Sequence, residues 1–407
     1  MATKTLSENI NQAISDFKGV KQAIIDKGVE IPSGTPTSEY GAKISEIQSG
    51  GSGGLDTSTI TNFNEFCINQ RIPIDCLGSL DTRSGTDFSY MFSGSSGLTT
   101  IPQLDTSSGT NFKTMFYGCS SLTTIPQLDT SKGTDFYYMF YGCSSLTEIP
   151  QLDTSQGTSF GSMFSGCTSL TEIHQLDFTS GGATCNYMFD NCKSLTTVSQ
   201  LDFGNVEEAQ YVFRFCSRLT TVSGLTLGGK CASMFSQCGV LETVTGLYAN
   251  PGADLSSLFS YCYRLTTVSN FDISQATKLN SMFYNCSGLT ELPQLDTSQA
   301  TSLNNMFSWC TKLKTINLTS FVSSQDMFYN CSALENLTVT GTITVNNNYL
   351  SLSSSTKLTV ESLLSVLNAL ADNTGKTTRT ITLGSTNLAK LTDEQKAIAT
   401  NKNYTLK

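Results

Sequence analysis

The stretch that decides the fold is NFKTMFYGCSSLTTIPQLDTSKG, residues 111–133, because variants of it fill most of the chain. Its most regular position is a Phe, usually preceded by Met. This Phe recurs at Phe92, Phe116, Phe140, Phe164, Phe189, Phe213, Phe235, Phe259, Phe283, Phe307 and Phe328, mostly 24 residues apart. A unit of this length that recurs in tandem predicts a solenoid, in which each repeat buries its apolar side against its neighbours.

An apolar frame accompanies the repeat Phe. Cys follows three residues later, with Ser95 in the first repeat, then Leu three residues further on, and then Ile, Val or Leu. The ten cysteines of this frame are Cys119, Cys143, Cys167, Cys192, Cys216, Cys238, Cys262, Cys286, Cys310 and Cys331. A frame kept through eleven repeats predicts one continuous core.

The local pattern predicts an α/β repeat. Phe112, Met115 and Phe116 are spaced three and four apart, which predicts a short helical turn. Gly118 before the Cys suits a bend with positive φ, as does Asn191 in a later repeat. Residues 122–126 predict an extended segment.

The Asp-Thr-Ser segment that follows, as in residues 105–109, predicts a turn. Its Asp and Ser oxygens are suited to accept from backbone N–H groups.

The chain divides into four parts: a helical attachment module (1–48), a Gly/Ser linker (49–54), the solenoid (55–340) and an α+β cap (341–407). In the first part, apolar residues alternate at spacings of four and three, a heptad seam that predicts a homo-oligomer of two or three strands, with a trimer favoured. The seam residues are Leu6, Ile10, Ala13, Phe17, Val20 and Ile24. In the last part, residues 358–370 and 392–399 predict capped helices, and residues 380–383 predict a strand.

The Met-Phe-x-x-Cys-x-x-Leu-Thr-x-Ile frame, followed by Leu-Asp-Thr-Ser, resembles the BspA-like leucine-rich repeats over about residues 80 to 340. This resemblance implies a leucine-rich solenoid, often an adhesin on bacterial or protozoan surfaces, and similar repeats also occur in phage proteins. Residues 21–32 and 40–47 resemble an N-terminal module of phage tail and fibre proteins.

Composition argues against several functions. The formal net charge of −9 argues against nucleic acid, and the sequence contains no apolar run of membrane-spanning length. The N-terminus shows no apolar segment of a secretory signal peptide. The only histidine, His174, replaces a Pro of other repeats, and the carboxylates are periodic turn residues, so we expect no enzyme, cofactor or metal site.

The cysteines are expected to be buried as small apolar residues, because ten of them share one repeat position. Disulfides between neighbouring repeats are the first alternative, disfavoured because a chain made in the cytoplasm should stay reduced. Zinc is the second, disfavoured because the chain has no Cys-x-x-Cys pair and only one histidine, His174.

Two surfaces are candidates for binding. One consists of tyrosines beside the repeat Phe, namely Tyr90, Tyr117, Tyr138, Tyr141, Tyr187, Tyr211 and Tyr284, which with Ser, Thr and Asn form a composition typical of recognition surfaces. The alternative is that these rings only pack between adjacent repeats. The other surface is a polar row on the extended segments: Thr100, Thr124, Glu148, Glu172, Gln103, Gln127 and Gln151.

The leading hypothesis is a phage or prophage virion protein, a fibre or receptor-binding appendage that docks to other virion proteins and presents the solenoid to a host surface polysaccharide or protein. The alternatives are a bacterial cell-surface adhesin of the BspA-like type and a virion decoration protein without a receptor.

Overall fold

The computed structural model describes residues 61–64, 80–173, 176–178 and 180–407. Its contacts separate an N-terminal body, Met1–Ala183, from a C-terminal body, Thr184–Lys407, and each is described by itself. The heptad seam, residues 1–54 as a whole and His174 lie outside the described residues.

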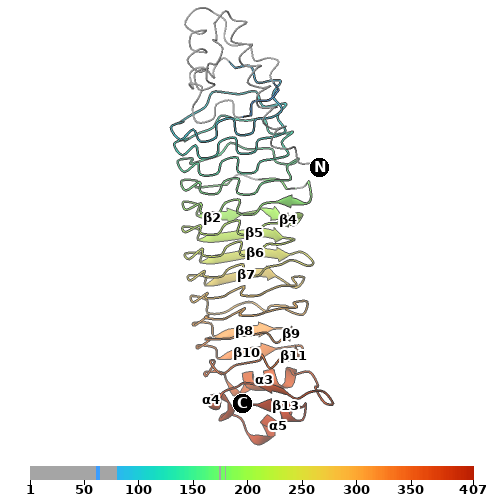
Figure 1. Cartoon of the computed structure of the whole chain (residues 1–407). Helices are drawn as coiled ribbons and strands as arrows, with labels where there is room; N and C mark the ends of the chain where they lie inside the picture. Colours follow the sequence, from blue (N-terminus) through green and yellow to red (C-terminus); the bar gives the residue numbers. More distant parts are fainter. Residues whose placement is uncertain (1–60, 65–79, 174–175, 179) are drawn as a thin grey trace, which may run out of the picture. The chain divides into compact units, whose positions relative to one another are not determined.

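Each body is a stack of chain turns, here called rungs, as Figure 1 shows. Parallel strands lie on successive rungs of the C-terminal body, in the order β2-β5-β6-β7, and β3 also pairs with β5. Two-stranded parallel pairs follow, β8 with β10 and β9 with β11. The strand bounds are β1 Ala183–Thr184, β2 Thr197–Ser199, β3 Asp202–Phe203, β4 Val206–Glu208, β5 Thr221–Leu227, β6 Thr243–Ala249, β7 Thr267–Asp272, β8 Thr315–Leu318, β9 Phe321–Val322, β10 Asn336–Val339 and β11 Ile343–Thr344.

The core is a column of stacked aromatic rings flanked by aliphatic and cysteine columns. Phe213, Phe235 and Phe259 are fully buried, with ring centroids 5.3 and 5.6 Å apart. The N-terminal body has a second column, in which Phe112 lies 5.8 Å from Phe88 and 5.6 Å from Phe136. The repeat period therefore works as predicted: equivalent residues stack and bury one another. The number of eleven repeats stays a prediction.

The predicted helical turn at the repeat Phe is wrong. Phe112 and Phe116 donate their N–H groups to Asp135 and Met139 on the next rung, at 2.9 and 2.8 Å, and not along a helix. Between them the chain makes a four-residue turn, closed by the Met115 N–H donating to the Phe112 carbonyl at 3.2 Å, with a positive φ of 60° at Thr114. An α-helix needs negative φ throughout and bonds to the fourth residue back, so the repeat is a β-solenoid rung, not an α/β repeat.

Helices are found in the described residues only near the C-terminus: α3 Val360–Ala369, α4 Ser385–Leu388 and α5 Asp393–Thr400. The longest has 10 residues, and none has the length and hydropathy of a membrane span. The helices predicted over 358–370 and 392–399 are thus present, and each begins at a Thr whose hydroxyl accepts an N–H three residues on. The predicted strand over 380–383 is β12, Arg379–Ile381, which pairs in parallel with β13, Tyr404–Leu406.

Prolines decide where the extended segment becomes a strand. The repeats with Pro102, Pro126 and Pro150 have no strand there, whereas β2, β5, β6 and β7 carry Ser or Thr at this position. Proline has no N–H to donate to a ladder. Glutamine amides substitute for it: the Gln103 Nε2 donates to the Gln127 carbonyl at 2.7 Å, and the Gln127 Nε2 to the Gln151 carbonyl at 2.6 Å.

The last long strand of the stack is covered by α3. The hydroxyls of Ser362 and Ser365 accept the N–H groups of Leu337 and Val339 on β10, at 3.0 and 2.9 Å. Strand N–H groups that would otherwise lack a partner are thereby satisfied. The predicted capping role of the C-terminal part and its bounds stay predictions.

Candidate functional site

The cysteine column is a structural element. The twelve cysteines in the described part of the chain are buried and free, and the same residues contain no cluster of three metal ligands. Nine of the frame thiols donate to a carbonyl of the preceding rung; the Cys286 Sγ, for example, donates to the Phe259 carbonyl at 3.1 Å. Burial raises the pKa of Cys167 and Cys310 to about 12, so these thiols stay neutral. The prediction of buried, small apolar cysteines is confirmed.

The candidate tyrosines of the N-terminal body form an aromatic cluster. Tyr117 stacks on Tyr141 at 5.0 Å, and the edge of Tyr138 meets both rings, at 6.0 and 5.1 Å. Tyr117 is exposed, whereas Tyr138 and Tyr141 are half-buried. Tyr90 lies half-buried two repeats before Tyr138, with the same positive φ. The alternative that these rings only pack between adjacent repeats therefore applies in part, because Tyr117 remains exposed to solvent.

In the C-terminal body, Tyr187 and Tyr211 stack at 4.8 Å beneath one guanidinium. Arg214 lies 5.1 and 5.0 Å from the two ring centroids, and its Nε bonds the Asp190 carboxylate at 2.9 Å. This arrangement fixes the two tyrosines within the protein. The last candidate, Tyr284, lies edge-on to Tyr261 at 5.3 Å.

Sequence reasoning missed a row of residues two positions after the repeat Phe. Three aromatic side chains occupy it, Phe215, Tyr261 and Trp309, and two of these are 38% and 41% exposed, Phe215 and Trp309. Aligning the repeats on their Phe would have revealed them, because most other repeats carry Gly, Asn or Gln at this position.

These three aromatics have left-handed backbones, with φ of 60°, 64° and 66°. A left-handed conformation costs an L-residue roughly 1–2 kcal/mol, and Gly or Asn adopts it more readily. The corresponding Gly118 and Asn191 have positive φ, as predicted. Large aromatics at such positions are a strained choice, and strained residues concentrate at functional sites. We call the surface formed by this row and its flanking residues the turn edge.

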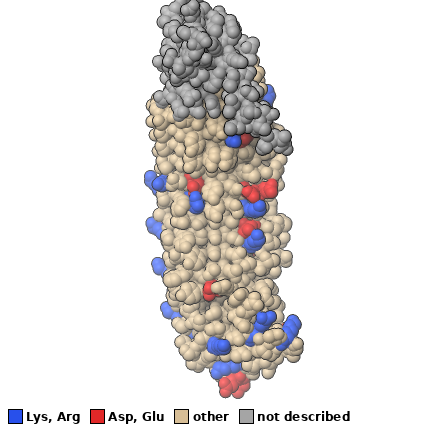
Figure 2. Space-filling model, in the orientation of Figure 1, with Lys and Arg blue, Asp and Glu red and all other residues tan. Residues whose placement is uncertain are grey.

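The turn edge also has a hollow of about 510 Å³ beside Phe215. It is lined by Asp190, Asn191, Lys193, Arg214, Phe215, Ser217 and Gln237. The Arg214 guanidinium, which is bonded to Asp190, lies 4.9 Å from the Phe215 ring centroid, and amides and Lys193 line the rest of the hollow. Lys and Arg side chains are spaced along one edge of the molecule in Figure 2.

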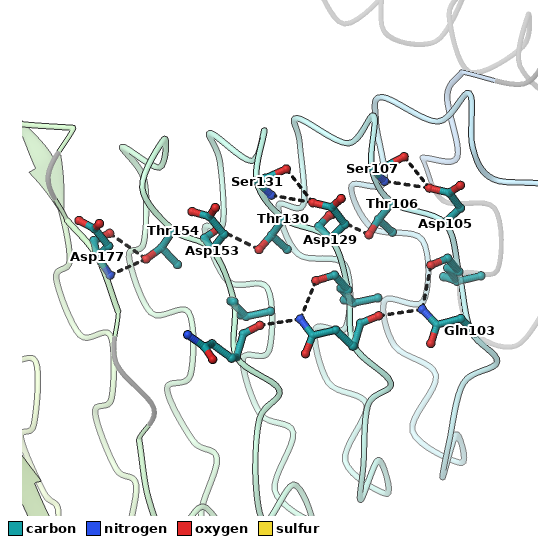
Figure 3. A pocket seen from close by; sticks show the side chains of 15 residues that line it. Gln103, Asp105, Thr106, Ser107, Asp129, Thr130, Ser131, Asp153, Thr154 and Asp177 are labelled. Atoms are coloured by element: carbon teal, nitrogen blue, oxygen red, sulfur yellow. Dashed lines mark hydrogen bonds between the residues drawn. The ribbon is translucent and has the colours of Figure 1, made fainter.

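A groove of about 1000 Å³ runs along the polar row of the N-terminal body, as Figure 3 shows. Its Gln side chains are exposed, as predicted, and so are its Asp side chains, but both bond mainly within the protein. The Ser107 N–H and hydroxyl donate to the Asp105 Oδ1 at 3.1 and 2.7 Å and hold the pKa of that carboxyl below its ordinary value. The predicted Asp turn is confirmed, and much of the bonding capacity of the groove serves the fold.

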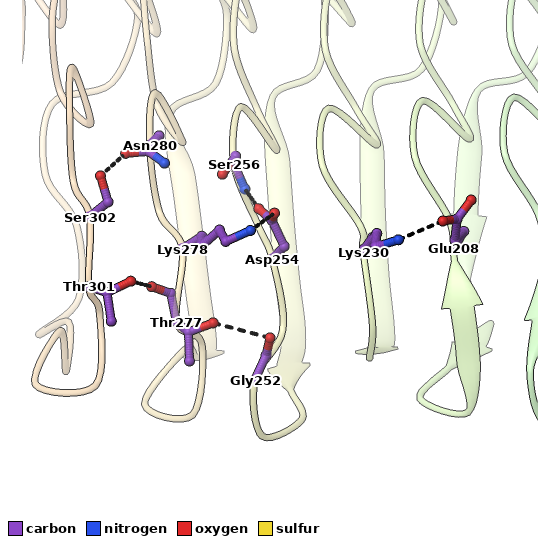
Figure 4. Close-up of polar contacts among 10 residues, drawn as sticks. All are labelled: Glu208, Lys230, Gly252, Asp254, Ser256, Thr277, Lys278, Asn280, Thr301 and Ser302. Carbon is purple, nitrogen blue, oxygen red and sulfur yellow. Dashed lines mark hydrogen bonds and ion pairs between the residues drawn. The ribbon is translucent and has the colours of Figure 1, made fainter.

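A second row of charges, five residues before the repeat Phe, is also satisfied internally (Figure 4). It alternates in sign: Glu208, Lys230, Asp254, Lys278. The Lys230 Nζ lies 2.7 Å from the Glu208 carboxylate, and the Lys278 Nζ lies 3.2 Å from that of Asp254. Pairing between rungs leaves little net charge on this row, so it is not a good candidate for a charged ligand.

The fold is a β-solenoid, and a match of the sequence to a family model shows which family the chain belongs to. The family described as "Mycoplasma protein of unknown function, DUF285" matches residues 38–148, 123–223 and 230–358, and the chain belongs to this family. A comparison with curated proteins gives no match.

Solved structures that match this chain do so at low sequence identity and with TM-scores below 0.5. A leucine-rich repeat protein from Bacteroides ovatus is 19% identical over 65% of this chain and 79% of its own, with a TM-score of 0.35. A leucine rich cell surface protein from Faecalibacterium prausnitzii is 21% identical over 60% and 77%, with a TM-score of 0.27. The functional domain of InlJ from Listeria monocytogenes, described as including a cysteine ladder, is 16% identical over 80% and 74%, with a TM-score of 0.21.

Proposed function

We propose that this chain is a non-catalytic, adhesin-type binding protein displayed at a bacterial cell surface, and that its turn edge contacts a polymer of another surface. One observation carries this proposal: exposed large hydrophobic residues gather at the turns. Seven such residues are exposed in the described part of the chain, and five lie within four residues after a repeat Phe: Tyr117, Phe215, Tyr263, Trp309 and Tyr329.

Rigid aromatic rings favour binding because they bring much contact area and lose little rotamer entropy. Here they are held by their neighbours: Trp309 meets the edge of Tyr329 at 5.8 Å, and Tyr261 that of Tyr263 at 6.1 Å. A surface of this kind is preorganised and does not have to form on binding. The buried, neutral thiols offer no nucleophile, which fits a binding role and not catalysis.

The second candidate is the virion appendage, a fibre or receptor-binding protein that oligomerises through the heptad seam. It rests on residues 1–54, which lie outside the described residues, and on their resemblance to phage modules. Deleting residues 1–48 is expected to convert a multimer, preferentially a trimer, to a monomer if this candidate is correct. A monomer before the deletion contradicts it.

Immunogold labelling with an antibody to the repeats decides between the two locations. Label on intact producing cells supports the surface adhesin, and label on released particles supports the virion appendage. Label found neither on intact cells nor on released particles contradicts both. In parallel, the fluorescently labelled full-length chain is applied to a panel of bacterial and epithelial cells. Saturable binding to at least one cell type is expected, and the absence of binding to every cell type contradicts the binding role.

A further inference from the structure

The turn-edge row of the C-terminal body alternates strictly between two chemical types. In sequence order it reads Asn191, Phe215, Gln237, Tyr261, Asn285, Trp309, Asn330. Aromatic side chains occupy every second rung, and amides occupy the rungs between them.

Backbone hydrogen bonds place these residues in one straight register. The Phe215 N–H donates to the Ser236 carbonyl, which places Phe215 beside Gln237. The Tyr261 N–H donates to the Tyr284 carbonyl, which places Tyr261 beside Asn285. Equivalent bonds, at 2.8 to 3.2 Å, join every neighbouring pair in the row. Strands lie about 4.8 Å apart, so the aromatic rings recur roughly every 9.6 Å.

Cations follow the same alternation. Three residues after each aromatic comes Arg218, Arg264 or Lys312, whereas the rungs between carry Ser194, Val240, Gly288 and Ala333 at this position. The sequences are thus Phe-Cys-Ser-Arg, Tyr-Cys-Tyr-Arg and Trp-Cys-Thr-Lys. The three cations are exposed on the outer side of the turn between the buried Cys and Leu.

The ion pair that Arg264 makes leaves its charge accessible to a ligand. Arg264 pairs with Glu242 at 2.8 Å, but both side chains are largely exposed, 64% and 45%. Such exposed pairs are weak and exchange readily with a competing anion. Unlike the Glu208 to Lys278 row, this row has one sign only, so it presents a periodic positive charge.

We infer that the turn edge binds an extended acidic polysaccharide whose disaccharide repeat carries one carboxylate. This inference rests on the proposed binding function and names its ligand. Two sugars of an extended chain have about the length of two rungs, so every second sugar would stack on Phe215, Tyr261 or Trp309. The carboxylate of each disaccharide would lie by Arg218, Arg264 or Lys312, and the amides between would bind hydroxyls.

Single-stranded nucleic acid is the competing polyanion, since it also binds aromatics and cations. It carries a phosphate on every nucleotide, whereas the cations here occur on every second rung, and the chain as a whole has a formal net charge of −9. The spacing and the net charge therefore favour the sparsely charged polysaccharide.

The test uses the full-length chain and three unsulfated polysaccharides with one carboxylate per disaccharide: hyaluronan, chondroitin and heparosan. Binding to oligosaccharides of equal length is measured by calorimetry, with carboxyl-reduced oligosaccharides and oligo-dT as comparisons. We expect saturable binding to at least one of the three, weakened about tenfold or more by carboxyl reduction. Binding to none of them, or tighter binding to oligo-dT, overturns the inference.

Variants drawn from the chain's own repeats separate binding from folding. Phe215→Asn, Tyr261→Asn and Trp309→Asn together install the residue that alternate rungs use, so the fold is retained while affinity falls about tenfold or more. Arg218→Ser, Arg264→Ser and Lys312→Ser are expected to lower affinity and reduce its salt dependence. Tyr248→Thr, which removes an exposed aromatic from strand β6, is the matched control and keeps wild-type affinity.

A residue exchange tests the two-rung spacing itself. Phe215→Gln combined with Gln237→Phe keeps the composition but moves one ring to the neighbouring rung. Weaker polysaccharide binding by a correctly folded exchange variant is expected, and unchanged affinity overturns the spacing argument.

Cell binding distinguishes the two levels of the proposal. Cell binding that the Asn and Ser variants leave intact, with no binding to the three polysaccharides, overturns this inference and leaves the adhesin-type function standing. Absence of any cell binding by the wild-type chain contradicts both the polysaccharide inference and the adhesin-type function.

Discussion

The most informative stability test compares two phenylalanines that are two residues apart in one repeat. Phe213 is fully buried, with ring centroids of Phe189 and Phe235 both 5.3 Å away, whereas Phe215 is 38% exposed. Replacing a buried Phe with Ala costs about 3–5 kcal/mol through lost burial and the cavity left behind. Two lost ring contacts, each worth about 0.5–1.5 kcal/mol, place Phe213→Ala in the upper part of that range. Phe215→Ala should change the free energy of unfolding by at most about 1 kcal/mol.

Urea denaturation followed by far-ultraviolet circular dichroism measures both variants. With an m-value of about 3 kcal/mol/M, Phe213→Ala is expected to lower the urea midpoint by more than about 1 M, and Phe215→Ala by less than about 0.4 M. Equal losses for the two variants would refute the division between a core column and an exposed turn edge.

Three further outcomes follow from the same geometry. In native protein at pH 8, a thiol reagent such as Ellman's should leave the twelve cysteines of the described part unmodified, because burial raises the pKa of thiols such as Cys119 to about 12. Rapid labelling of any cysteine other than Cys67 and Cys76, which lie outside the described residues, contradicts this expectation. Because hydrogen bonds from Ser107 and Ser131 lower the pKa of Asp105 and Asp129 below the unfolded value, their stabilising effect is present above that value, near pH 4, and is lost as pH falls through the folded pKa. Thermal midpoints measured from pH 5 to pH 2 should therefore fall less steeply for the Ser107→Ala, Ser131→Ala double variant than for wild type. Parallel curves of thermal midpoint against pH would contradict the stabilising role of these hydrogen bonds. Ser362→Ala with Ser365→Ala should lower the free energy of unfolding by about 1–3 kcal/mol for each N–H left without a partner on β10. Urea denaturation measures this loss, with Glu361→Ala at an exposed position as the control. A loss no larger than in the control would rule out the role of these hydroxyls.

The repeat architecture was readable from the sequence because its signal lies in burial. Phe116, Cys119 and Leu122 recur at fixed offsets, and all three are fully buried. The helical turn was mispredicted because spacings of three and four also fit consecutive tight turns. The difference lies in where the N–H groups go: Phe116 donates to Met139 on the next rung, a partner that no local pattern reveals.

The candidate surface was only partly predictable. Tyr117 proved exposed, but Tyr187 and Tyr211 are fixed beneath Arg214, a contact between rungs that one repeat in isolation does not show. Phe215 and Trp309 were missed because Phe and Trp are expected in the core, whereas here a left-handed backbone turns them toward solvent.

The most direct test of the central claim, that the turn edge binds a carboxylated polysaccharide, uses the single tryptophan of the chain. Trp309 lies in the turn-edge row and is 41% exposed, so its fluorescence reports on that surface alone. Titration with the three carboxylated oligosaccharides is expected to change the emission saturably for at least one of them and to protect Trp309 from acrylamide quenching. Emission and quenching that stay unchanged at saturating concentrations of all three would contradict the account.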